Sequence, residues 1–184
     1  TLLSSYDYPT DGAKTVLVLY NVYPFPEWGV VDYFQSYVTP RTQGTFMAMV
    51  LRPEGNDQYR VMYGQSFQAP ALSNAQLWNY DILGEPWKVR IGDIYAHYGN
   101  GIPLNLPNGG PNLSEPIYYD IVDQQPQPIV GDTISIPSST YPYFSQDRDY
   151  GLAAHLVPTP EPASFLLLGA GLAAIAFARR KSSH

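Results

Sequence analysis

The stretch Gly44–Phe67, GTFMAMVLRPEGNDQYRVMYGQSF, decides the fold class of this chain. Two runs of apolar, aromatic and β-branched residues, GTFMAMVL and QYRVMYGQSF, flank the turn-forming residues PEGND. In the second run Tyr59, Val61 and Tyr63 fall at every second position. This period of two is typical of a sheet strand with two different faces. The stretch therefore predicts a β-hairpin.

Similar short runs continue on both sides of the hairpin and contain no amphipathic helix pattern. Glycine and proline separate them, and no repeat of 20 to 50 residues is visible. The runs predict an all-β fold, and we expect an antiparallel two-sheet β-sandwich of jelly-roll type. The glycine- and proline-rich residues 99–116 are expected to form a long surface loop. The runs are KTVLVLYNVY (14–23), VVDYFQSYV (30–38), QLWNYDIL (76–83), WKVRI (87–91), IYAHY (94–98), IYYDIV (117–122), TISI (133–136) and YGLAAHLV (150–157).

Composition excludes several functional classes. The chain has no cysteine, so disulfides, thiolate nucleophiles and cysteine-ligated zinc are excluded. The residues before Ser164 include all 16 acidic residues and seven of the ten basic residues, so the net charge of this part of the chain is 7 − 16 = −9. Nucleic-acid binding needs clustered lysine and arginine, and we expect no nucleic-acid partner. The chain begins at Thr1 without methionine, which predicts that a secretory signal peptide has been removed.

The C-terminal residues 157–184, VPTPEPASFLLLGAGLAAIAFARRKSSH, differ from the rest of the chain. A proline-rich hinge is followed by an uncharged run of about 15 residues, roughly 22 Å as a helix. An uncharged apolar run of this kind predicts a transmembrane helix. The helix is a short one, because a bilayer core is about 30 Å thick and is usually spanned by about 20 residues. A basic cluster that would stay cytoplasmic follows it: Arg179, Arg180 and Lys181. The apolar run comprises Phe165, Leu166, Leu167, Leu168, Gly169, Ala170, Gly171, Leu172, Ala173, Ala174, Ile175, Ala176, Phe177 and Ala178.

Two other interpretations of this run are open. A buried core helix would suit the length, but such a helix normally keeps a polar face, and this run has none. A permanent membrane anchor is the second, and the short span makes it the weaker choice, since about 15 apolar residues hold less firmly than about 20.

The order Pro160-Glu161-Pro162, apolar run, basic cluster resembles the PEP-CTERM sorting signal of Gram-negative bacteria. The resemblance implies export, transient anchoring in the inner membrane, and processing near the Pro-Glu-Pro by an exosortase, a membrane-embedded cysteine transpeptidase. Proteins with this signal belong largely to biofilm-forming bacteria, so the resemblance implies a final place at the cell surface or in the extracellular matrix. Exopolysaccharide is a candidate partner. We expect an extracellular domain in residues 1–157 and the sorting signal in residues 158–184.

A second resemblance covers the domain itself. GDIYAHYGNGIPLN (92–105) and YPYFSQDRDYGLAAHL (141–156) are similar to an ectodomain common among PEP-CTERM proteins. The resemblance implies an all-β secreted domain and brings no catalytic residues with it. The positions that fit its first motif are Tyr98, Gly99, Gly101, Ile102 and Pro103; those that fit its second are Arg148, Tyr150 and Ala154.

The sequence contains no recognisable catalytic constellation. His97 and His155 each stand alone in an expected strand, and His184 lies in the C-terminal stub, so metal ligation is not predicted. Neither a GxSxG elbow nor a glycine-rich phosphate loop is present. Asp120 with Asp123, or Asp147 with Asp149, are paired carboxylates that could form a glycosidase site, but ordinary surface charge explains them better. We therefore expect a non-enzymatic protein without cofactor or metal.

The 16 tyrosines support one alternative, a carbohydrate-binding module in which exposed rings stack on sugars. A β-sandwich enzyme acting on glycans is a further and weaker alternative. For most tyrosines, packing in the core is the more common role. The candidates that lie in or beside irregular stretches are Tyr95, Tyr98, Tyr118, Tyr119, Tyr141 and Tyr143.

Overall fold

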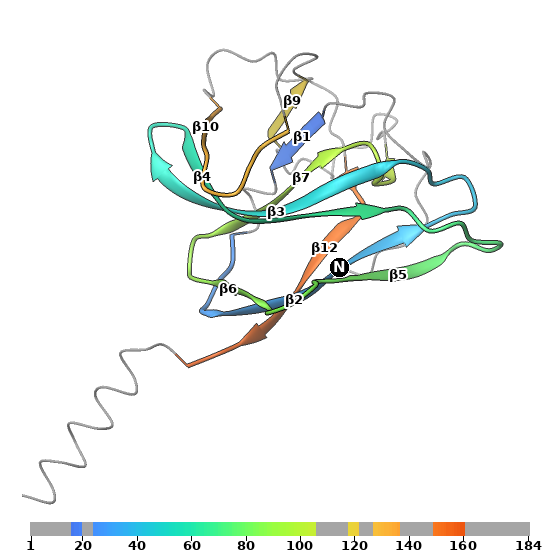
Figure 1. Cartoon of the computed structure of the whole chain (residues 1–184), viewed down its shortest axis with the longest axis horizontal. Helices are drawn as coiled ribbons and strands as arrows, with labels where there is room; N and C mark the ends of the chain where they lie inside the picture. Colours follow the sequence, from blue (N-terminus) through green and yellow to red (C-terminus); the bar gives the residue numbers. More distant parts are fainter. Residues whose placement is uncertain (1–15, 20–23, 106–117, 122–126, 137–148, 161–184) are drawn as a thin grey trace, which may run out of the picture.

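The computed structural model of the chain describes residues 16–19, 24–105, 118–121, 127–136 and 149–160 (Figure 1). Within these ranges every regular element is a β-strand, which confirms the all-β prediction for the described residues. The strands are β1 (Val16–Leu19), β2 (Gly29–Val38), β3 (Thr45–Gly55), β4 (Gln58–Gln68), β5 (Gln76–Asp81), β6 (Trp87–Val89), β7 (Ile94–Gly99), β8 (Leu104–Asn105), β9 (Tyr118–Ile121), β10 (Thr133–Ser135), β11 (Asp149–Tyr150) and β12 (Leu152–Pro158).

The larger sheet has six strands in the order β10-β4-β3-β7-β1-β9, and all its pairings are antiparallel. The predicted hairpin, β3 and β4, lies inside this sheet (Figure 1). Its turn is tighter than the five residues PEGND suggest, because only Asn56 and Asp57 separate the strands. Both have positive φ, 52° and 58°, as a type I′ turn requires.

The smaller sheet is built around β2, the longest of its strands. One edge of β2 pairs with β12. The other edge pairs with β5 along Tyr33–Val38 and with β6 along Gly29–Val31. Residues 82–86 therefore interrupt what would otherwise be one long strand along this edge. All three pairings are antiparallel.

The two sheets share one buried cluster, so they pack face to face. The larger sheet contributes Val18, Phe46, Ala48 and Val50, and the smaller contributes Val31, Phe34, Val38, Tyr80, Trp87, Val89 and Leu152. Phe46 meets Tyr80 across the interface with ring centroids 4.9 Å apart. A second cluster, which includes Leu19, Met49 and Leu51, lies on the other face of the larger sheet. Because β3 is covered on both faces, Phe46 to Leu51 are all buried and its sequence reads as an unbroken apolar run.

The expectation of a surface loop is wrong for its first residues. Gly101, Ile102 and Pro103 are buried, and Ile102 belongs to the shared core with no exposed surface. The reason is close backbone packing: a Cβ on Gly99, which has φ 104°, would lie 2.6 Å from the carbonyl oxygen of Thr45. Glycine lets the chain pass β3 closely and turn inward. Residues 106–116 of the expected loop lie outside the described residues.

The two pieces of the ectodomain motif lie side by side. β8 pairs with β11, with Leu104 opposite Tyr150 and Asn105 opposite Asp149. The backbone N–H of Gly151 donates a hydrogen bond of 2.8 Å to the carbonyl oxygen of Pro103. The motif residues that are separated by more than 40 positions in sequence thus meet at one place in the fold.

Candidate functional site

The C-terminal strand β12 leads directly into the Pro-Glu-Pro segment. β12 is an edge strand that stays paired to β2 as far as Pro158, opposite Gly29. The N–H of Thr159 then donates to the carbonyl oxygen of Trp28 at 2.9 Å, and 158–160 are exposed. Proline is tolerated at the end of an edge strand, and Pro160 cannot continue the ladder because it has no N–H. The fold therefore holds the chain as far as Thr159, and Pro160 does not extend the ladder.

The rest of the predicted sorting segment follows Pro160. Glu161 and Pro162, the apolar run 165–178 and the basic cluster 179–181 lie outside the described residues, so the expected transmembrane helix stays a prediction. The described part of the chain includes no helix long and apolar enough to cross a membrane.

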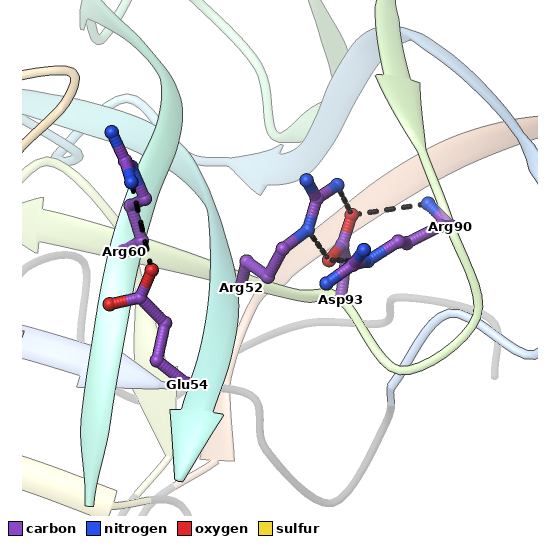
Figure 2. A network of polar contacts seen from close by, with 5 residues as sticks. All are labelled: Arg52, Glu54, Arg60, Arg90 and Asp93. Atoms are coloured by element: carbon purple, nitrogen blue, oxygen red, sulfur yellow. Dashed lines mark hydrogen bonds and ion pairs between the residues drawn. The ribbon is translucent and has the colours of Figure 1, made fainter.

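An ion-pair network fixes the turn between β6 and β7 to β3 (Figure 2). The carboxylate of Asp93 has only 1% of its surface exposed and accepts two hydrogen bonds from Arg52, each of 2.8 Å. The backbone N–H of Arg90 donates to the same carboxylate at 3.1 Å, and the guanidinium of Arg90 lies 3.7 Å away. The bonds with Asp93 raise the pKa of Arg52 above its ordinary value.

Sequence reasoning missed this network. Arg52 and Arg90 counted only toward the charge of the domain, although Asp93 lies in the Gly-Asp pair that opens the ectodomain motif. The pair forms a turn in which Asp93 donates its N–H to the carbonyl oxygen of Arg90 at 3.1 Å. Gly92 has φ 85°, which suits the third position of a type II turn. The adjacent Gly92 and Asp93 indicated the turn in the sequence, but they did not indicate that Asp93 would bond to Arg52 on β3.

His97 lies on β7 of the larger sheet, opposite Ala48 of β3, with no exposed surface and its ring 6.5 Å from that of Phe46. Burial lowers the pKa of His97 to about 3, so the ring is neutral at physiological pH. This histidine therefore contributes to stability in a pH-dependent way.

We expect acid to destabilise the fold through His97. The unfolded chain takes up a proton near pH 6.5 and the folded chain near pH 3, so this contribution is complete above pH 6.5 and is lost as the pH falls toward 3. Between pH 8 and pH 5 the free energy of unfolding should fall by about 2 kcal/mol. In His97→Gln this part of the slope should disappear, whatever the variant's absolute stability. Urea unfolding at both pH values measures it, and parallel slopes in the two proteins would contradict the prediction.

His155 and Asp32 form a second polar pair, on the outer face of the smaller sheet. The Nδ1 atom of His155 lies 2.6 Å from Oδ1 of Asp32, and the ring of Tyr33 stacks on the imidazole with centroids 4.3 Å apart. Both partners are partly exposed. The two residues are 123 positions apart, so no local pattern could have shown the contact.

The structure does not bring Tyr95 and Tyr98, two of the tyrosines proposed for sugar stacking, to one face. Tyr95 is half-buried against the shared core, with its ring 6.1 Å from that of Phe25. Tyr98 packs against the second cluster, on the opposite face of the larger sheet. Tyr118 and Tyr119 belong to β9, but their side chains lie outside the described residues, as do Tyr141 and Tyr143. Glycan binding by this set stays a prediction.

The described residues contain no group of three or more histidine, aspartate or glutamate side chains that could hold a metal ion. Of the paired carboxylates considered above, Asp123 and Asp147 lie outside the described residues, as do the side chains of Asp120 and Asp149, so a glycosidase site stays a prediction.

Comparison with known proteins identifies the C-terminal segment. Residues 158–181 match the family model described as the PEP-CTERM protein-sorting motif. No curated protein and no solved structure matches the chain. The match begins at Pro158, the last residue of β12.

Proposed function

We propose that this chain, which carries a PEP-CTERM protein-sorting motif, is an exported, non-enzymatic protein of the cell surface or extracellular matrix of a Gram-negative bacterium. An exosortase in the inner membrane recognises and processes the motif, and the tail anchors the precursor until then. The ectodomain is a two-sheet β-sandwich of jelly-roll type. This architecture is supported by the core that the two sheets share.

The observation that supports this function most strongly is the junction between fold and motif. β12 stays paired until Pro158, the motif match begins at that residue, and the exposed Pro160 follows within two positions. Among the described residues, the paired part of the domain and the sorting motif therefore share only Pro158 and Thr159. A processing enzyme can cleave at or after Pro160 without opening the ladder between β12 and β2.

The non-enzymatic role is supported by how the most buried ionisable groups are used. Asp93 is held by Arg52 and fixes a turn, and His97 is packed inside the fold with a strongly lowered pKa. Catalytic groups are normally placed in a cleft with access to substrate. Asp93 and His97 are both buried, so we assign them to stability.

Intact-mass measurement of the chain, produced in a bacterium that has an exosortase, tests the sorting function. The mature protein should end near the Pro-Glu-Pro segment. The double variant Glu161→Ala/Pro162→Ala should accumulate as a precursor that ends at His184. A matched control is Glu85→Ala/Pro86→Ala, which removes a Glu-Pro pair from an exposed loop of the folded domain and should be processed normally. A wild-type protein that still ends at His184 would overturn the proposal.

A further inference from the structure

Three segments of the chain meet at one end of the smaller sheet. β6 and β12 lie on opposite edges of β2 and are both antiparallel to it, so both leave the sheet where β2 begins (Figure 1). Gly29 marks this end, since it pairs with Val89 on one side and with Pro158 on the other. We call residues 24–28, 90–92 and 157–160 the exit tip.

Hydrogen bonds tie the parts of the exit tip together. The N–H of Gly92 donates to the carbonyl oxygen of Phe25 at 3.0 Å, and the N–H of Phe25 donates to that of Asp93 at 2.8 Å. Thr159 is bound to Trp28 in the same way, at 2.9 Å. The bond between Asp93 and Arg52 then fixes the turn to β3. These hydrogen bonds give the exit tip a defined backbone structure.

The exit tip exposes apolar side chains and carries little charge. Ile91 is 54% exposed at the apex of its turn, Val157 is 40% exposed, and Trp28 is half-buried. Its charged residues are one carboxylate, Glu27, and one guanidinium, Arg90. The rest of the domain is strongly acidic and would be repelled by anionic lipid. Tryptophan and aliphatic side chains with few charges suit the boundary between lipid and water.

The tether between the exit tip and the apolar run is short. Thr159 is the last described residue with a hydrogen bond to the fold, and only residues 160–164 separate it from Phe165. Fully extended, this link spans at most about 20 Å. The headgroup layer on one side of a bilayer takes up about 5–7 Å of that distance. An inserted tail therefore holds the exit tip within about 15 Å of the headgroups.

We propose that the exit tip lies in the headgroup region of the membrane while the precursor is anchored, with Ile91, Trp28 and Val157 in contact with lipid. The inference rests on the proposed function, because it needs an inserted tail. It adds that the folded domain itself binds the lipid surface. The domain is then held in one orientation, and Pro160 and the residues after it lie at the level of the headgroups, within reach of a membrane-embedded processing enzyme.

Single-cysteine labelling tests this proposal, since the chain has no native cysteine. The full chain is reconstituted in protein-free vesicles of phosphatidylethanolamine and phosphatidylglycerol that contain nitroxide lipids. An environment-sensitive fluorophore is attached at Ile91→Cys or Val157→Cys in the exit tip, at Ala174→Cys in the tail, or at Leu77→Cys as control. Leu77 is 41% exposed and pairs with Tyr37, about 26 Å along β2 from Gly29.

Headgroup nitroxide should quench the label at positions 91 and 157 about threefold more than at position 77, because Tyr37, the partner of Leu77, lies about 26 Å along β2 from Gly29. Acyl-chain nitroxide should quench the label at position 174. If position 174 is quenched but positions 91 and 157 do not exceed position 77, the exit-tip proposal is overturned and the anchored precursor stands. If position 174 is not quenched, the anchored precursor is overturned and the exit-tip proposal falls with it.

Discussion

Replacing Arg52 by methionine should lower the free energy of unfolding by about 3–5 kcal/mol, the usual cost of leaving one partner of a buried ion pair alone. The side chain of Asp93 is 1% exposed, and both hydrogen bonds from Arg52 to its oxygens would be lost. The remaining donor of known geometry is the N–H of Arg90, and the guanidinium of Arg90 at 3.7 Å is too exposed to replace Arg52. Urea or guanidinium unfolding measures the change.

The matched control is Arg60→Met, which removes an arginine from the neighbouring strand. Arg60 lies 3.8 Å from Glu54, and both side chains are well exposed (Figure 2). Surface pairs of this kind contribute little, so its stability should change by less than about 1 kcal/mol. Equal losses in the two variants would show that the loss reflects the arginine's packing on β3 and β4 and not the buried charge of Asp93.

The strands were predictable from sequence because their signals are local. Alternation and turn residues within Gly44–Phe67 were enough to predict the hairpin, and Val30–Val38 matches β2 to within one residue. The turn was less predictable: the run PEGND contains several turn formers, and only the structure shows that Asn56 and Asp57 adopt positive φ. Strand order was not predictable, because β12 pairs with β2 more than 100 residues away.

The buried polar contacts could not be predicted either, because their partners lie far apart in the sequence. Arg52 and Asp93 are 41 positions apart, and each looks like an ordinary surface charge in its own segment. The inward turn of Ile102 was misread because asparagine, glycine and proline usually mark surface loops. Here glycine serves close packing against β3 instead.

The sorting signal could be read from sequence alone for a different reason. The sorting signal consists of consecutive segments of the chain: a proline-rich segment, an apolar run and a basic cluster. Its recognition in the sequence therefore requires no knowledge of the fold. The match of residues 158–181 to the PEP-CTERM motif confirms that prediction. The exit tip is the opposite case, since residues near positions 25, 91 and 158 come together only through the pairing of β6 and β12 with β2.

Replacing Phe46 by alanine should cost about 3–5 kcal/mol, as expected for truncating a buried phenylalanine. Phe46 is 1% exposed, and its ring lies 5.5 Å from that of Phe67 and 4.9 Å from that of Tyr80. Tyr80 belongs to the smaller sheet, so the cavity would open between the two sheets. Phe67→Ala, at a half-buried ring of the same cluster, is the matched control and should cost clearly less. If the sheets form one cooperative sandwich, Phe46→Ala will shift a single unfolding transition, followed by tryptophan fluorescence and far-ultraviolet circular dichroism together. Two separate transitions in these probes would instead mean that each sheet is stable without the other, and that the shared core contributes little to holding them together.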